Sequence, residues 1–129
     1  MLQGMLIPVV MLLAACGGGT AGSSTAEPEG QAAGASAFAV CANCHTLKQG
    51  APHRSGPNLH NLIGRKAGEA QGFAYSPALR GSGIVWDAQS LDEYLAAPAQ
   101  RVPGTRMTHA TPDAARRQAI IQYLSAPAQ

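Results

Sequence analysis

The chain has 129 residues, of which nine are Lys or Arg and seven are Asp or Glu, so its formal net charge at neutral pH is +2. The basic residues are scattered, without a basic stretch or stacking aromatics, which excludes a nucleic-acid-binding protein. Two Phe, three Tyr and one Trp are a small stock for the core of one small domain.

The N-terminus carries an apolar run typical of an export signal. Residues 1–15 contain the run Met5–Leu13, which is too short to span a bilayer and predicts a signal peptide. The segment Leu13-Ala14-Ala15-Cys16 resembles a bacterial lipobox, which implies cleavage before Cys16 and acylation of that residue. An ordinary signal peptide with an incidental cysteine is the alternative.

The next segment, residues 16–33, consists mainly of Gly, Ala, Ser, Thr and Glu, with hardly any large apolar side chain. Such a composition cannot bury enough surface to fold, so it predicts a flexible tether. A tether of this length has a root-mean-square reach of about 20–25 Å. The folded domain expected over residues 34–129 would therefore stay close to the membrane.

Cys41, Cys44 and His45 form the motif C-x-x-C-H, the spacing of a covalent c-type haem site. The two thiols can add to the vinyl groups of a porphyrin, and His45 then lies beneath the iron as its ligand. Met107 is the only methionine outside the N-terminal segment and can supply a thioether on the other face. A Met/His pair is typical of an electron-carrying cytochrome.

Three other interpretations of the two cysteines are open. A thioredoxin-like pair needs a βαβ context, which the sequence does not show. A zinc site needs two further ligands, for which His53 and His60 are candidates, although no second cysteine pair exists. A structural disulfide between Cys41 and Cys44 leaves His45 without a role.

Three helices are predicted in the folded part, and no strand-like alternation occurs in it. The first covers about 34–44. The second covers 90–97 and starts with a capping box, in which Ser90 caps the helix and Glu93 reaches back. The third, 112–125, has proline at its first helical position and an acid in its first turn. The fold class is therefore all-α, with three main helices and long loops.

Six further blocks, in this order and spacing, resemble a class I cytochrome c of the mitochondrial type. They are Gly56–Leu59, Leu62–Gly68, Gly72–Ser76, Gly83–Trp86, Leu91–Leu95 and Val102–Met107. The resemblance covers essentially all of Phe38–Leu124. It implies a cytochrome c fold wrapped round one haem c, which is attached through Cys41 and Cys44 and ligated by His45 and Met107.

The resemblance also implies roles for the residues around the haem. The carbonyl of Pro57 accepts a hydrogen bond from His45 and so fixes the ring. Tyr94 and Thr105 hydrogen-bond near Met107. The groups that bind or neutralise the haem propionates are Arg65, Tyr75, Ser76 and Trp86. As alternatives, Trp86 is a plain core residue, Tyr75 a surface hydroxyl and Arg65 a solvated loop charge.

In the family the first and last helices cross, and a glycine permits their close approach. In this chain that implies Gly34 and Phe38 against Ile120 and Tyr123. The chain departs from the mitochondrial pattern at Leu79, which stands where an asparagine is usual.

His109, two residues after Met107, is an alternative iron ligand. The Pro-Gly-Thr-Arg-Met block, residues 103–107, favours Met107 over it.

These features predict a single-electron carrier rather than an enzyme, because two axial ligands leave the iron no open site. We expect a monomer, lipid-anchored on the periplasmic side of a bacterial membrane. It would take electrons from a quinol-oxidising complex and pass them to a terminal oxidase or reductase. With only Lys48 and Lys66 as lysines, charge steering is modest.

Two alternatives for the function are a fixed electron-relay subunit of an oxidase or reductase complex, and a haem gas sensor or peroxidase from whose iron Met107 dissociates.

Overall fold

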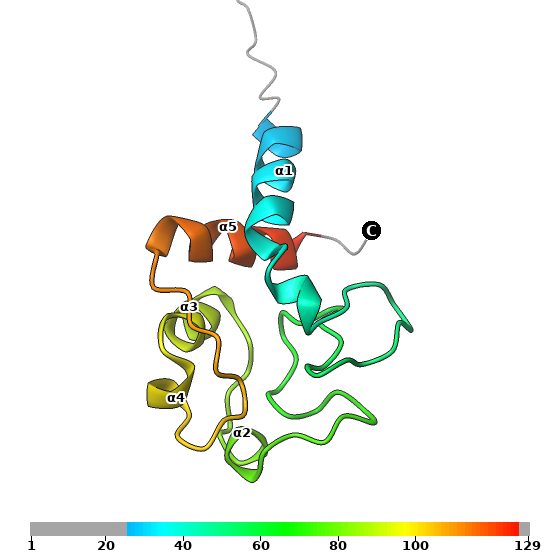
Figure 1. Cartoon of the computed structure of the whole chain (residues 1–129), viewed down its shortest axis with the longest axis vertical. Helices are drawn as coiled ribbons and strands as arrows, with labels where there is room; N and C mark the ends of the chain where they lie inside the picture. Colours follow the sequence, from blue (N-terminus) through cyan, green and yellow to red (C-terminus); the bar gives the residue numbers. More distant parts are fainter. Residues whose placement is uncertain (1–25, 127–129) are drawn as a thin grey trace, which may run out of the picture.

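Two helices from opposite ends of the sequence cross at one side of the molecule (Figure 1). The structure is a computed structural model that describes residues 26–126. The elements in chain order are α1 (Ala26–Phe38), the 3-10 turn η1 (Cys41–Asn43), α2 (Pro77–Arg80), α3 (Ala88–Ala96), α4 (Pro98–Arg101) and α5 (Ala114–Ser125). In residues 26–126 the only pairing of β type is an isolated bridge between Lys66 and Val85. The predicted all-α class is confirmed.

The crossing of α1 and α5 is the predicted one. A Cβ atom at Gly34 would lie 2.6 Å from Cβ of Tyr123, so only glycine allows the two helices to come this close. One turn later, the rings of Phe38 and Tyr123 lie 5.6 Å apart. Ile120 is 1% exposed and belongs to the same buried cluster as Phe38. The expected contacts of Gly34 and Phe38 with Tyr123 are therefore confirmed.

The first helix differs from the prediction at both ends. It begins at Ala26 and ends at Phe38, where 34–44 was expected. Part of the segment expected to be flexible, 26–33, is thus helical, because its Ala, Glu and Gln residues have high helix propensity even without burial. The rest of that segment, the expected signal peptide and Cys16 lie outside the described residues. None of the helices in 26–126 is long and apolar enough to cross a membrane.

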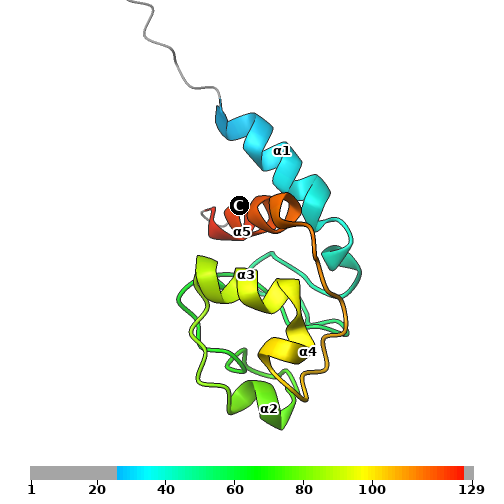
Figure 2. The ribbon, with the colours of Figure 1, turned by 90° about the vertical axis from the view of Figure 1, so that its left-hand side faces the viewer.

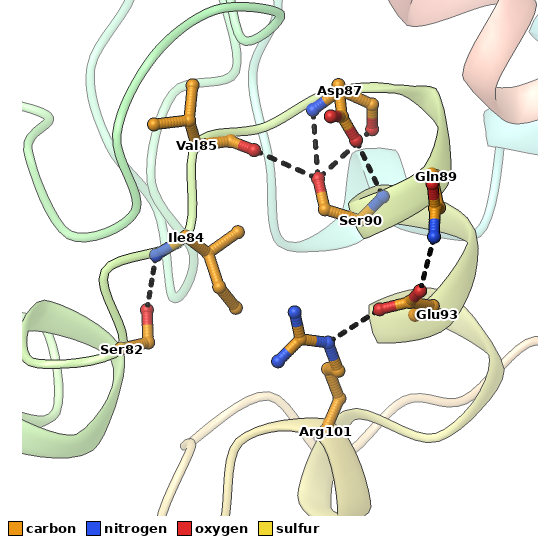
Figure 3. Close-up of polar contacts among 8 residues, drawn as sticks. All are labelled: Ser82, Ile84, Val85, Asp87, Gln89, Ser90, Glu93 and Arg101. Atoms are coloured by element: carbon orange, nitrogen blue, oxygen red, sulfur yellow. Dashed lines mark hydrogen bonds and ion pairs between the residues drawn. The ribbon is translucent and has the colours of Figure 1, made fainter.

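The start of α3 also differs from the prediction, and Figure 3 shows why. The cap is Asp87, whose Oδ1 accepts a hydrogen bond from the Ser90 amide at 2.7 Å, while the Asp87 amide donates to Ser90 Oγ at 2.9 Å. The predicted capping box, with Ser90 as the cap and Glu93 reaching back, is therefore wrong. Asp and Ser cap equally well, and Asp87 lies three residues earlier. The Glu93 carboxylate instead accepts from Arg101 Nε at 2.8 Å.

The last helix ends at Ser125, as expected, but begins at Ala114, two residues later than predicted. Its N-cap is Asp113, whose Oδ1 accepts from the Arg116 amide at 2.6 Å. Pro112 therefore precedes the helix and is not its first residue. An aspartate cap satisfies an amide at the helix start that proline placement alone leaves free.

Helix α3 lies beside α5 (Figure 2). The loops of residues 39–76 lie on the side of the molecule away from α3 and α4 (Figure 1). Arg117 on α5 donates to the carboxylate of Asp92 on α3 at 2.8 Å, which ties the two helices together. Leu91, Tyr94 and Leu95 form the buried face of α3. This inward face brings Tyr94 toward the loop that carries Met107.

Candidate functional site

The C-x-x-C-H motif forms a single tight turn after α1. The amides of Cys44 and His45 both donate to the carbonyl of Cys41, at 3.0 and 2.9 Å. Both cysteines are free thiols, Cys41 half-buried and Cys44 exposed, so the structure does not form the alternative disulfide. Burial raises the pKa of the Cys41 thiol, against a smaller opposing effect of the Arg116 charge. The turn presents two thiols and an imidazole from one short segment.

The His45 ring is held by the hydrogen bond that the resemblance implied. Its Nδ1 lies 2.7 Å from the carbonyl oxygen of Pro57. Because a carbonyl can only accept, Nδ1 carries the proton and donates. Burial lowers the pKa of His45, although the Pro57 contact opposes that shift. Burial therefore favours the neutral ring, in which Nε2 has the lone pair that a metal would bind.

Met107 lies on a loop that is hydrogen-bonded to two other parts of the molecule. The hydroxyls of Tyr94 and Thr105 share a hydrogen bond of 2.6 Å, and Thr105 Oγ1 also accepts from the Met107 amide at 3.4 Å. The second anchor is Arg106, whose Nη1 donates to the carbonyl of Ala74 at 3.0 Å. Met107 itself is half-buried against the core. The thioether is thus carried on a loop with defined anchors.

The four residues expected at the propionates are engaged within the protein. Arg65 donates from Nη1 to the carbonyl of His60 at 3.1 Å and from Nη2 to that of Asn58 at 3.0 Å. It is thus a part-buried, bonded side chain and not a solvated loop charge.

The other three differ in their contacts. Ser76 Oγ caps α2 by accepting from the Leu79 amide at 3.2 Å. Tyr75 is buried, which raises its pKa, so it is not a surface hydroxyl. Trp86 packs in the core against Tyr94, with ring centroids 5.1 Å apart, which agrees with the alternative that it is a plain core residue. Propionate binding by these residues stays a prediction.

The remaining histidines have separate surroundings. Both nitrogens of His53 are engaged, since Nδ1 accepts from the Asn58 amide at 2.9 Å and Nε2 donates to the carbonyl of Gln71 at 2.8 Å. His60 is partly buried, and His109 is exposed. Within residues 26–126, no three His, Cys, Asp or Glu side chains lie close enough to hold a metal ion. The zinc interpretation therefore lacks its ligands there.

Two contacts around the site were not predicted. The buried Asn58 joins the loop after His45, because its Nδ2 donates to Thr46 Oγ1 at 2.8 Å and to the carbonyl of Lys48 at 2.9 Å. The second is the Arg106 contact to Ala74. The asparagine could have been found from its place directly after Pro57. The arginine gives no local signal, because its partner lies 32 residues away.

The donor set fits a covalently attached haem c. Two free thiols three residues apart match the two vinyl groups, and a neutral imidazole with its Nδ1 already engaged offers Nε2 to iron. A thioether on a separate anchored loop completes a pair of axial ligands.

Comparison with known proteins shows close similarity. The chain is 47% identical to cytochrome c2 of Rhodoblastus acidophilus over 94 residues, which are 72% of this chain and 88% of that protein. It is 42% identical to cytochrome c of Ginkgo biloba over 85 residues, 65% of this chain and 75% of that protein. Among solved structures, cytochrome cH of Methylobacterium extorquens matches with a TM-score of 0.68 and 43% identity, covering 73% of this chain and 95% of that one. No family model matches the chain.

Proposed function

Because this chain belongs to the class I c-type cytochromes, electron carriers that hold one covalent haem c and are not enzymes, we propose that it shuttles single electrons between respiratory complexes of a bacterial membrane. We assign His45 and Met107 as the axial ligands, and Cys41 and Cys44 as the points of attachment. The observation that carries this assignment is the 2.7 Å contact of His45 Nδ1 with the Pro57 carbonyl, which leaves Nε2 as the metal-binding nitrogen.

Bound haem c supplies one iron centre that gains or loses a single electron. The residues of the chain hold the two proposed ligands in place. Pro57 holds the imidazole of His45 and makes its free nitrogen more basic. The hydrogen bond of Thr105 with Tyr94 and that of Arg106 with the Ala74 carbonyl both hold the loop of Met107. Ligands that move little between oxidation states favour fast electron transfer.

We further propose that the chain is exported and held at the periplasmic face of a membrane through acylated Cys16. The apolar run before Cys16 and the lipobox-like Leu13–Cys16 support this. A tethered carrier meets membrane partners at high effective concentration, so it depends less on charge steering. A quinol-oxidising donor and a terminal oxidase or reductase as acceptor fit a carrier in that position.

The test follows electrons through isolated membranes. Quinol is added to membranes that contain the wild-type chain. The rates at which the haem of the chain is reduced and then reoxidised are followed by absorption. The variant Cys16→Ser is expected to appear in the soluble fraction and to lose most of the membrane-dependent rate at equal total concentration. Adding the Cys16→Ser protein back to the membranes in excess should restore the rate. Recovery of the wild-type chain only in a fixed ratio with one oxidase would favour the fixed-relay alternative and contradict shuttling.

A further inference from the structure

The turn that contains Gly56 and Pro57 touches the His45 ring in two places, and only one is the hydrogen bond to Pro57. A Cβ atom at Gly56 would come closest to Cε1 of the ring, and would lie 2.7 Å from Nδ1 and 2.8 Å from Nε2. If this Cβ atom lay in the plane of the ring at those distances from both nitrogens, it would almost be at bonding distance from Cε1. The position therefore lies over the face of the ring, so Gly56 covers one side of the imidazole.

Backbone contacts fix the place of Gly56. Its amide donates to the carbonyl of Cys44 at 2.9 Å, and its carbonyl accepts from the Arg54 amide at 3.0 Å. The Arg54 guanidinium in turn donates to the carbonyl of Ala42, between the two cysteines, at 2.7 Å. The surface that covers the ring is thus fastened to the C-x-x-C-H turn itself. It cannot move away from the ring without breaking these bonds.

The need for glycine at this position is steric. Among residues 26–126, six other glycines have positive φ angles and Gly56 does not, so a left-handed backbone does not demand glycine here. The constraint that remains is contact with the ring. The hydrogen bond to Pro57 alone tolerates tens of degrees of bending, which would let the ring plane rock about that bond. Close cover by Gly56 removes this freedom on one side.

We propose that Gly56 is a positioning residue that sets the plane of the His45 imidazole and, through it, the electronic properties of the iron. The proposal rests on the proposed ligation by His45. The plane of an axial imidazole decides how its π system overlaps the iron orbitals, and groups that orient a ligand tune the metal it binds. A methyl group at Gly56 has to turn the ring or push the turn away.

The test compares Gly56→Ala with Gly30→Ala, both with haem attached. Gly30 is the control because it lies in α1 with nothing within 4 Å of an added Cβ. Proton NMR of the oxidised proteins gives the four haem-methyl shifts, which report the ring plane, and a redox titration gives the potential. We expect Gly56→Ala to change the spread of the methyl shifts and to displace the potential, while Gly30→Ala matches the wild type. Methyl shifts and a potential in Gly56→Ala equal to those of the wild type overturn the proposal.

A second measurement on the wild type covers the case in which Gly56→Ala does not retain haem. If Gly56 covers the ring, proton NMR of the reduced wild type should show cross-relaxation between its α protons and the Hε1 proton of His45. The absence of that contact would contradict the proposal. Failure of the underlying function looks different: the wild type itself would lack the spectrum of His/Met ligation. An unchanged Gly56→Ala with that spectrum intact overturns only the role of Gly56.

Discussion

The hydroxyl of Tyr94 on α3 lies 2.6 Å from the hydroxyl of Thr105, two residues before Met107. Tyr94 is buried on the inner face of the helix, and burial raises its pKa, although the Thr105 bond opposes the shift. Its hydroxyl therefore stays protonated and available for the hydrogen bond. This pair connects the rigid helix to the loop that carries the proposed distal ligand.

Replacing Thr105 by valine should loosen that connection. The variant keeps the shape of the side chain but leaves the buried Tyr94 hydroxyl without its partner, which costs about 1–2 kcal/mol of unfolding free energy. Denaturant unfolding of the haem-loaded protein measures this loss. The sulfur–iron absorption band should also disappear at a lower denaturant concentration. Thr108→Val, at an exposed neighbouring threonine, is the control, and equal stability of the two variants would contradict the role of the hydroxyl pair.

The helix crossing predicts opposite effects for two glycines of α1. Gly34→Ala places a methyl 2.6 Å from Cβ of Tyr123 and 3.1 Å from the carbonyl of Ala119, so α1 and α5 must separate. We expect a loss of about 1–3 kcal/mol, typical of overpacking. Gly30→Ala meets nothing and should gain about 0.5–1 kcal/mol from helix propensity. Thermal unfolding compares the two, and a stabilised Gly34→Ala would show that the helices do not cross as described.

The cap of α3 gives a third prediction. Ser90 Oγ accepts from the Asp87 amide and donates to the carbonyl of Val85 at 3.0 Å. Ser90→Ala removes both contacts and should lower the unfolding free energy by about 1 kcal/mol. Gln89→Ala, on the exposed face of the same turn, should change it little. If Ser90 were the cap and Glu93 its partner, Glu93→Ala would be as harmful as Ser90→Ala.

The link between α3 and α5 predicts a pH dependence. The hydrogen bond from Arg117 holds the pKa of Asp92 below its usual value, and desolvation opposes this. Because the pKa of Asp92 is lower in the folded state than in the unfolded chain, its charge stabilises the fold at pH values above the unfolded pKa of about 3.9. That stabilisation is lost as the pH falls through the pKa of the folded state. Asp92→Asn should therefore lower the Tm near neutral pH, and the difference should vanish in strong acid.

The control for this pH series is Glu69→Gln, which breaks an exposed ion pair with Lys66 at 3.6 Å and should change the Tm little at any pH. A difference between Asp92→Asn and the wild type that persists at the acid end would mean that the charge of Asp92 is not its cause.

Features with a fixed spacing could be predicted from the sequence. The C-x-x-C-H turn, the contact of His45 with Pro57 and the crossing at Gly34 follow from short patterns or from the resemblance. The helix starts could not be predicted, because Asp87 and Ser90 are both good caps and only the packed structure chooses between them. The contacts of Gly56 with the ring and of Arg106 with Ala74 depend on how distant segments pack, which local patterns do not encode.

The most direct test of the central claim, ligation by His45 and Met107, is the absorption spectrum of the oxidised protein matured with haem c, recorded for the wild type, Met107→Ala and His109→Ala. We predict a low-spin spectrum with the weak far-red sulfur–iron band in the wild type and in His109→Ala. Met107→Ala should lose this band and gain carbon monoxide binding when reduced. A wild-type protein without the band, or a spectrum altered by His109→Ala and not by Met107→Ala, would contradict the assignment.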